Sequence, residues 1–408
     1  MGPFDRLGSI ALVALAMVVG VQGFSLPIVS VQAQTHWEVG AQVGFARREQ
    51  LQSYFADPST ALHTRLLPFF KTTEGKAYVN ELRRNADEHY PEYMEELRGM
   101  AHAADLDFDS VFVLNCESEI GLLAPKPGHL GVHCTDVLVP SLRNPDGFQS
   151  AWIGHNEDYS PEMIDQVFLL NATIDESEES FVSFIYPGTL PGWAFSMNQH
   201  GVAVTANAVF PKVVGRNASV PLVFAARRAI AASSVEQAKQ WLNSLPLPLS
   251  GGIALNMADG HGPQGNVASV ELAHPIVTTR DITADREAYF FHFNQYRHNP
   301  MLRNETIDES SVARSNAANE LLHQNKDLLD STDGILKVLG DTQDPELPIF
   351  RTGNKDNIFT LATALFDANH GTLDVWTANP RFSAPTYRFP KPSRFPARNR
   401  QQPQQTTT

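Results

Sequence analysis

The distribution of apolar and polar positions divides the chain into a helical part and a part dominated by strands. Between Trp37 and Arg98 the apolar residues recur at helical spacing, and residues 89–102 combine a charged face with an apolar one. From Cys134 onward, short apolar and β-branched runs separated by turn residues predict strands. Because helices and strands occur in separate blocks, the pattern favours an α+β fold of two stacked antiparallel sheets covered by helices.

Two hairpins are marked by their turns. Arg143-Asn144-Pro145-Asp146-Gly147 lies between apolar runs at residues 137–139 and 151–154, and Gln199-His200-Gly201 lies between residues 194–198 and 202–207. Further strands are predicted at residues 167–173, 180–186, 253–259, 266–272, 289–294, 357–366 and 372–378. Further helices are predicted at residues 222–232, 235–245 and 310–324. The Gly- and Pro-rich residues 121–131 predict an exposed loop directly before Cys134.

The composition is that of a soluble globular protein, with 42% hydrophobic and 19% charged residues among 408. The formal net charge of −14 argues against nucleic acid as a partner, because phosphate binding requires clustered Lys and Arg. The same charge disfavours an anionic membrane surface. We therefore expect a small-molecule partner, with no nucleic acid and no membrane once a leader is removed.

The N-terminus has the pattern of a secretory leader. The apolar residues 10–21 are too few to span a bilayer comfortably, and a small-residue cleavage pattern follows at Val31-Gln32-Ala33, with an earlier option at Val21-Gln22-Gly23. We expect residues 1–33 to be a signal peptide and the protein to be secreted or lumenal, with an uncleaved signal anchor as the alternative. Three glycan acceptor sequons agree with a secretory route: Asn171-Ala172-Thr173, Asn217-Ala218-Ser219 and Asn304-Glu305-Thr306.

Common cofactor and metal motifs are missing or out of context. Residues 260–265 match G-x-G-x-x-G, but a predicted strand follows where a dinucleotide fingerprint needs a helix. The chain has no P-loop, no H-E-x-x-H and no paired C-x-x-C, and His292 and His298 are too far apart to share one helical face. The sequence thus predicts neither a metal nor an organic cofactor.

The two cysteines, Cys116 and Cys134, allow two interpretations. They can form one disulfide, as secreted chains often do. Alternatively, Cys134 is a nucleophile at the start of its strand, toward which the hairpin returns Asn156, Glu157 and Asp158.

Cleavage of the His133–Cys134 bond would complete such a site, because it gives Cys134 a free α-amine. The pKa of an α-amine, about 7.7–8.0 in model peptides, suits a general base near neutrality. One residue would then supply both nucleophile and base. The amides of Asn256, Asn198 and Asn207 are candidates for an oxyanion donor, although such side chains equally often bond to neighbouring backbone.

Several short motifs occur in a set order between about residues 37 and 390. They are Leu114-Asn115-Cys116-Glu117-Ser118-Glu119-Ile120, Cys134-Thr135-Asp136, Gly154-His155-Asn156-Glu157-Asp158, Asn198-x-x-Gly201, the helix of Arg314, and Thr360-Leu361-Ala362. In this order they resemble the peptidase C45 family of N-terminal-nucleophile hydrolases. That family includes penicillin-forming acyl-coenzyme A acyltransferases and insect β-alanyl-amine hydrolases.

The resemblance implies a four-layer αββα sandwich and a precursor that cuts itself before Cys134. It divides one domain into an N-terminal part, residues 34–133, and a nucleophile-bearing part, residues 134–389, which would stay together as a heterodimer. The Pro- and Gln-rich residues 390–408 are expected to be a disordered tail.

The resemblance also assigns roles within the site. It implies Cys134 as the nucleophile, Asp158 near the amine of that residue, Asn256 as the oxyanion donor and Arg314 as a residue that orders the site. In addition, we expect Asn156, Glu157 and Asn198 to contact the substrate. Many members carry glycine before the nucleophile, whereas this chain has His133, which can instead carry a proton during cleavage.

The predicted activity is that of an amidohydrolase that cleaves small N-acyl amines or amino acid conjugates, such as β-alanyl amines, through a thioester on Cys134. Resolution of the thioester by an amine would instead make an acyl-coenzyme A-dependent acyltransferase. A third alternative is a non-catalytic secreted binding protein in which Cys116 and Cys134 are bridged.

Overall fold

The computed structural model describes residues 23–124, 133–143, 149–262, 264–300 and 304–393. In this part of the chain the strands form two sheets. The larger sheet has the order β1 (Ile28–Ala33), β4 (Phe168–Ile174), β5 (Glu179–Ile185), β6 (Phe195–Asn198), β7 (Ala203–Ala208), β8 (Gly252–Asp259), β9 (Asn266–Ala273) and β10 (Ile276–Asp281). The smaller sheet has the order β11 (Phe290–His292), β2 (His133–Arg143), β3 (Gln149–Tyr159), β12 (Phe359–Asp367), β13 (Thr372–Trp376) and β14 (Tyr387–Pro390).

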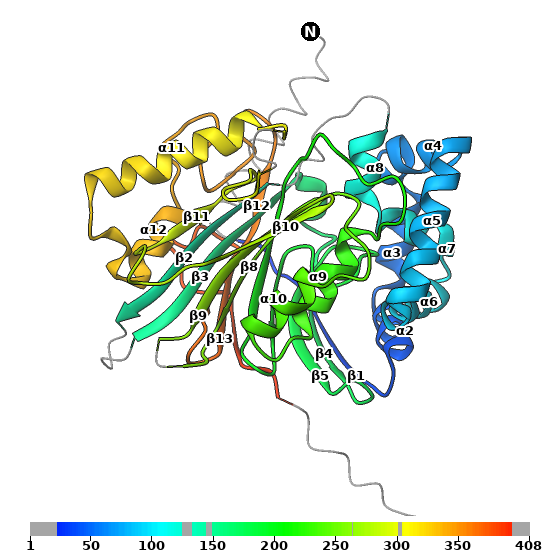
Figure 1. Ribbon diagram of the computed structural model, residues 1–408, viewed down its shortest axis with the longest axis horizontal. Coiled ribbons are helices and arrows are strands. Elements are labelled where there is room, and N and C mark those ends of the chain that lie inside the picture. The colour runs from blue at the N-terminus through cyan, green and yellow to red at the C-terminus, as the bar shows by residue number, and fades with distance from the viewer. Residues whose placement is uncertain (1–22, 125–132, 144–148, 263, 301–303, 394–408) are drawn as a thin grey trace, which may run out of the picture.

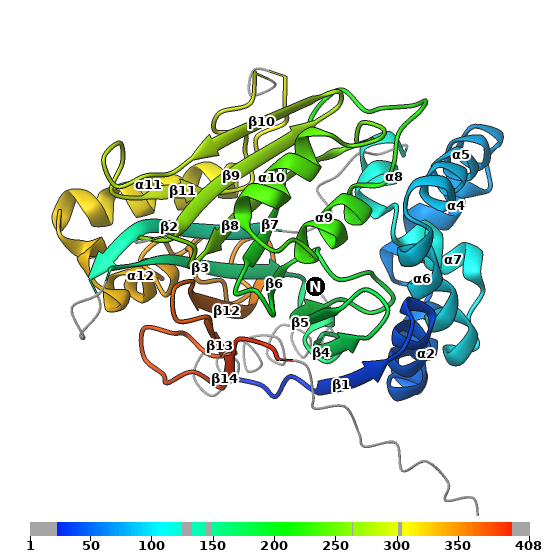
Figure 2. The same ribbon diagram turned by 60° about the horizontal axis from the view of Figure 1, so that its bottom comes forward.

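The two sheets stack face to face between two layers of helices (Figures 1 and 2). Strand β2 packs against β7 and β9, and β3 packs against β8. Helices α9 (Leu222–Ile230) and α10 (Val235–Asn243) cover the outside of the larger sheet, while α11 (Glu309–Gln324) and α12 (Thr332–Leu339) cover the smaller one. The expected α+β class and αββα layering are therefore confirmed.

The core explains why the predicted strands form. Every residue of β5, β8 and β12 is buried, because these strands lie inside a sheet that is covered on both faces. All neighbouring strands pair antiparallel except β1 and β4, which pair parallel. The predicted hairpins β2–β3 and β6–β7 are both present.

The N-terminal part is helical, as predicted, and lies beside the sandwich (blue and cyan in Figure 1). Its elements are α2 (His36–Ala46), α3 (Arg48–Ala56), η1 (Leu62–Leu66), α4 (Leu67–Phe70), α5 (Thr73–His89), α6 (Pro91–Ala104), α7 (Phe108–Leu114) and α8 (Glu117–Leu123). A buried ionic cluster ties this part to the sandwich, because Arg227 of α9 bonds to Glu96 of α6 at 2.7 Å and to Glu179 of β5 at 2.8 Å. Helix α8 also includes residues 121–123, which the sequence placed in an exposed loop, and residues 125–132 of that loop lie outside the described residues.

The last residues of the expected leader, 28–33, are part of the larger sheet, and the leader itself stays a prediction. Residues 28–33 form β1, which pairs along its whole length with β4, and Val29, Val31 and Ala33 are buried. Removal of this strand would expose the edge of β4 and the apolar side chains beneath it. The earlier boundary at Gly23 leaves β1 in place, and residues 1–22 lie outside the described residues.

Among the described residues, no helix combines the length and the apolar character needed to cross a bilayer. The predicted tail also falls largely outside this part of the chain, because residues 394–408 are not described. Pro390, where the sequence places its beginning, is the last residue of β14.

Candidate active site

The site is built on the two faces of the β2–β3 hairpin. In its register Cys134 lies opposite Glu157, and His133 lies opposite Asp158. Side chains alternate along a strand, so neighbouring residues point to opposite faces of the sheet. We call the face toward the larger sheet the inner face; its polar residues are Cys134, Asp136, His155 and Glu157. We call the face toward α11 and α12 the outer face; its polar residues are His133, Thr135, Asn156 and Asp158.

A buried chain of hydrogen bonds runs along the inner face. His155 Nδ1 lies 2.6 Å from Asp136 Oδ1, and His155 Nε2 lies 2.9 Å from Glu157 Oε2. The hydroxyl of Tyr186, just after β5, donates to Glu157 Oε1 at 2.6 Å. The hydrogen-bonded series ends at the Cys134 thiol, because Cys134 Sγ is 3.8 Å from Glu157 Oε2. Four ionisable side chains and a phenol thus share protons in the space between the sheets.

Burial has a large effect on which of these hydrogen-bonded side chains carry a proton. It raises the pKa of the Cys134 thiol well above its usual value, and the carboxylates of Glu157, Asp158 and Asp136 add to the effect. Burial also raises the pKa of Glu157. For His155, burial opposes the charged form, but Asp136 and Glu157 outweigh it and raise the pKa to about 10. The thiol is therefore protonated at neutral pH and needs an adjacent base.

The same inner-face atoms are the group best spaced for a metal ion in the described part of the chain. One ligand atom each from Cys134, His155 and Glu157 lies within 4.8 Å of the others. The hydrogen bond that Asp136 accepts from His155 and the one that Tyr186 donates to Glu157 account for this clustering as a proton chain.

Two asparagines of the larger sheet, Asn256 and Asn207, lie against the inner face. Asn256 Nδ2 donates to Asp136 Oδ2 at 2.6 Å and to Asn207 Oδ1 at 2.8 Å, so both of its N–H donors are engaged. Asn207 Nδ2, on β7, is buried and has no partner among the described residues. In this arrangement the open side-chain N–H belongs to Asn207, and the oxyanion role expected for Asn256 stays a prediction.

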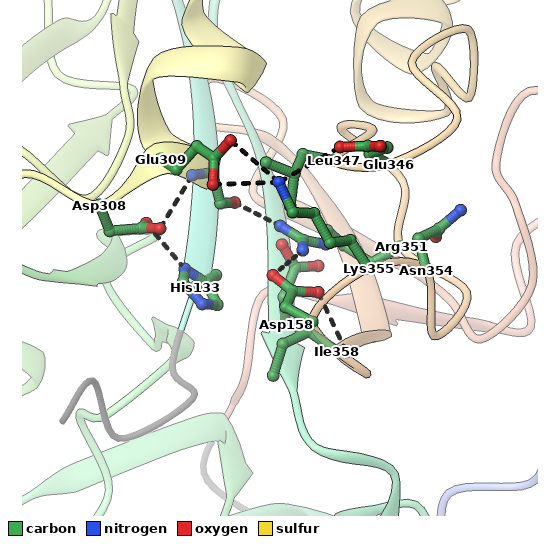
Figure 3. Close-up of polar contacts among 12 residues, drawn as sticks. His133, Asp158, Asp308, Glu309, Glu346, Leu347, Arg351, Asn354, Lys355 and Ile358 are labelled. Carbon is green, nitrogen blue, oxygen red and sulfur yellow. Dashed lines mark hydrogen bonds and ion pairs between the residues drawn. The ribbon is translucent and has the colours of Figure 1, made fainter.

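On the outer face, the residues next to the expected cleavage point lie beside the start of α11 (Figure 3). His133 Nδ1 is 3.3 Å from Asp308 Oδ2, and burial lowers the pKa of His133 while Asp308 opposes that shift. Asp158 Oδ1 accepts a hydrogen bond from Thr360 Oγ1 at 2.6 Å, whereas the buried Asp158 Oδ2 has no partner among the described residues. Arg351 donates to Ser310 at the start of α11.

Arg314, from α11, holds the backbone of Cys134. Its guanidinium donates to the carbonyl of Cys134 at 2.5 Å and to Thr135 Oγ1 at 2.9 Å. It also donates to Asn294 Oδ1 at 2.8 Å, and the same oxygen accepts the backbone N–H of Cys134 at 2.9 Å. Arg314 and Asn294 together hold the backbone N–H and C=O of Cys134, and the ordering role expected for Arg314 stays a prediction.

The side-chain N–H groups of Asn156 and Asn198 donate to the backbone of other elements. Asn156 Nδ2 donates to the carbonyl of Leu339, at the end of α12. Asn198 Nδ2 donates to the carbonyls of Ile230 and Ala232, and its Oδ1 accepts N–H groups of its own turn. The structure does not bring either amide to the thiol, so substrate contact by them stays a prediction.

Both cysteines are buried and free, so the disulfide of the third alternative is not formed. Cys116 precedes α8 in the N-terminal part, where burial raises the pKa of its thiol. Cys134 remains available as a nucleophile.

A pocket opens at the end of β3, beside the start of β2. Its walls include Tyr159 and Tyr186 together with Glu117 of α8. Tyr186 belongs to both the pocket and the inner face, because its hydroxyl bonds to Glu157. A small molecule in this pocket would therefore lie next to the residues that face the Cys134 thiol.

Comparison with known proteins identifies the family. The model of the acyl-coenzyme A:6-aminopenicillanic acid acyl-transferase family matches residues 143–381, which is more than half of the chain. The chain belongs to this family. The resemblance to the C45-type N-terminal-nucleophile enzymes is thereby confirmed, and the family supports an enzyme. The matched range begins shortly after Cys134, so the assignment of the nucleophile rests on the site itself.

Two individual proteins are similar to this chain. A β-alanyl-dopamine/carcinine hydrolase of Drosophila melanogaster is 23% identical over 377 residues, which covers 87% of this chain and 94% of that protein. The crystal structure of a mutant conjugated bile acid hydrolase from Clostridium perfringens is 14% identical, with a TM-score of 0.36 over 59% of this chain and 88% of that one. The family and the first relative indicate an amide hydrolase or acyltransferase.

Sequence reasoning missed four members of the site: Asp136, His155, Tyr186 and Asn294. Asp136 and His155 carry a usable signal, because each lies two residues from Cys134 or Glu157 on a predicted strand and thus shares its face. Tyr186 and Asn294 lie on other elements, and only the stacking of the sheets and the pairing of β11 with β2 bring them near.

Proposed function

We propose that this protein is a self-processing N-terminal-cysteine amidohydrolase that cleaves small N-acyl amines of the β-alanyl type. The observation that carries the proposal is the position of the Cys134 thiol, 3.8 Å from a carboxylate that His155 and Tyr186 also contact. A thiol that is protonated by burial needs such a neighbour to become a nucleophile.

In the proposed maturation, Cys134 Sγ gives its proton to Glu157 and attacks the carbonyl carbon of His133. The bond between that carbon and the nitrogen of Cys134 then breaks, the nitrogen takes a proton, and a thioester joins His133 to Sγ. Water hydrolyses the thioester, leaving the His133 carboxylate, a free thiol and a free α-amine. Arg314 and Asn294 support the step because they hold the carbonyl and the N–H of Cys134 in place.

After cleavage, Asp158 of the outer face would hold the new α-amine of Cys134. Asp158 lies opposite His133, the residue whose bond to Cys134 is lost, and its buried Oδ2 has no partner among the described residues. The new ammonium or amine of Cys134 supplies a donor for that oxygen. Asp158 would thus hold the amine that serves as base, as the sequence predicts.

In turnover, the thiol of Cys134 attacks the amide carbonyl of the substrate and the α-amine carries the proton to the leaving amine. The open N–H of Asn207 stabilises the oxyanion, with Asn256 holding its amide in place. Water then releases the acyl group from the thioester. The proposed substrate class follows the Drosophila relative, which is a β-alanyl-dopamine/carcinine hydrolase.

The two chains made by cleavage would stay together as a heterodimer. Strand β1 of the first chain pairs with β4 of the second, and Glu96 of the first binds Arg227 of the second. We also propose that residues 1–23 direct the protein into the secretory pathway and are then removed.

The test is the release of dopamine from N-β-alanyl-dopamine by the purified mature protein without coenzyme A. We expect turnover by the native protein, none by Cys134→Ala, and near-native turnover by Cys116→Ala, which removes the other buried thiol. Turnover by Cys134→Ala would refute the assignment of Cys134 as the nucleophile. Turnover only when an acyl-coenzyme A and an acceptor amine are supplied would establish the acyltransferase instead.

A further inference from the structure

The pocket beside the inner face is lined by both aromatic and polar side chains. Aromatic rings form much of its wall, and one carboxylate lies among them together with the aliphatic hydroxyls of Ser118 and Thr189. The residues that matter here are Tyr54, Tyr159, Tyr186, Trp193, Glu117 and Ser118. Tyr159 and Tyr186 contact each other, with their ring centroids 5.2 Å apart.

The carboxylate of Glu117 retains capacity to bind a ligand. Within the described part of the chain it accepts a single hydrogen bond, from the Tyr159 hydroxyl at 3.3 Å, and its side chain is only partly buried. A carboxylate can accept about four hydrogen bonds, so most of this capacity is unused. A second polar group is also open, because Trp193 Nε1 is buried without a partner in the same part of the chain.

The pocket connects to the nucleophile through two short contacts. The Tyr186 hydroxyl is 2.6 Å from Glu157 Oε1, and Glu157 Oε2 is 3.8 Å from Cys134 Sγ. Tyr159 lies two residues beyond Glu157 on β3, so both side chains are on the inner face. Glu117 therefore contacts Tyr159, which shares its face of β3 with Glu157, the residue that contacts the thiol.

We propose that this pocket binds the positively charged end of the acyl group, with Glu117 as the residue that selects an ammonium-bearing acyl chain. The inference rests on the proposed function and names the part of the substrate that the site recognises. Aromatic faces attract a cation, and a carboxylate with a neighbouring hydroxyl accepts the N–H groups of an ammonium. A β-alanyl group ends in such an amine, three bonds from its carbonyl carbon, and in this proposal the amine extends from the thiol toward the pocket.

The charge of Glu117 gives the pocket a pH dependence. Burial raises its pKa to about 7, while the hydrogen bond from Tyr159 and the charge of Arg65 lower it. Tyr54 from α3 also faces this group, and burial together with Glu117 raises the pKa of its phenol. Because a carboxylate is charged above its pKa, preference for an ammonium-bearing acyl chain should increase as the pH rises through about 7.

The experiment compares N-β-alanyl-dopamine with N-butanoyl-dopamine, which has a methyl group in place of the terminal amine. In the mature native protein we expect kcat/KM to favour the β-alanyl substrate by about 10- to 100-fold, since a hydrogen-bonded charge contributes about 1.5–3 kcal/mol. Glu117→Gln should remove most of this preference and leave the butanoyl rate nearly unchanged. Glu119→Gln is the matched control, because Glu119 lies on the same helix and bonds instead to the Leu222 N–H at 2.7 Å.

The outcomes separate this inference from the proposed function. If both substrates are cleaved through Cys134 at equal kcat/KM, or if Glu117→Gln lowers both equally, the inference is overturned and the hydrolase stands. Calorimetric binding of β-alaninamide and n-butyramide to the native protein gives a readout without turnover. Tighter binding of the charged amide, lost in Glu117→Gln, supports the pocket; equal binding of the two amides overturns it. Should Glu117→Gln not fold, the native preference between the two amides decides.

Discussion

The two faces of the β2–β3 hairpin differ in how far their polar groups are satisfied. On the inner face, Glu157 is in contact with His155, Tyr186 and the thiol before any bond is cut. On the outer face, Asp158 keeps one oxygen without a partner among the described residues, opposite the residue that cleavage separates from Cys134. In the reaction proposed above, this difference lets adjacent carboxylates serve successive stages, the first in maturation and the second in the mature site.

The largest effect that would test this comparison is expected from Glu157→Gln. The amide keeps the shape of the side chain but cannot take the thiol proton, so self-cleavage should slow by about 10²- to 10⁴-fold. The measurement is the fraction of precursor cleaved over time, quantified by denaturing electrophoresis. Native cleavage rates in this variant would show that Glu157 is not the base.

A smaller and later effect is expected from Asp158→Asn. The precursor should still cleave, because Asp158 is on the face away from the thiol, whereas turnover by the cleaved protein should fall by about 10- to 100-fold through loss of the charge that holds the amine. The measurements are the cleaved fraction and kcat on the same preparation. If Asp158→Asn blocks cleavage while leaving kcat intact, the assignment of stages to faces is reversed.

The smallest of the three effects is expected from Asn207→Ser, which tests whether the open amide N–H on the inner face stabilises the oxyanion. Shortening this side chain withdraws the open N–H while retaining a small polar group, so kcat should fall by about 10-fold, less than the roughly 10²- to 10³-fold loss typical when an oxyanion donor is removed outright. KM should change little, because the donor acts on a charge that develops in the transition state. A matched change in Asn198, whose amide binds only backbone in the described part of the chain, should leave kcat unchanged.

The fold was largely predictable because its signals are local. Apolar runs, their turns and the separation of helices from strands define the α+β class, and the β2–β3 hairpin follows from the same pattern. The parallel strand β1 was not predicted, because its partner β4 is far away in the chain. A short apolar segment after a leader-like stretch has the same composition as the end of a signal peptide.

The site was predictable only in part. The sequence places Cys134 at the start of a strand and carboxylates at the end of the next one, but it does not say which carboxylate shares the face of the thiol. A shift of the register by one residue would place the other carboxylate on the face of the thiol. Strand β2 contains an irregularity between Val139 and Leu142, so its register cannot be found by counting residues from the turn. Asn207 and Tyr186 come from the opposite sheet, and their positions depend on how the sheets stack.

The central claim is that Cys134 attacks the carbonyl of the residue before it. The most direct measurement is the intact mass, under denaturing conditions, of the purified protein during incubation. The account predicts two polypeptides, the second beginning at Cys134, whose appearance follows first-order kinetics independent of protein concentration. A chain that stays whole while it hydrolyses N-β-alanyl-dopamine, or a break at any other bond, would contradict it.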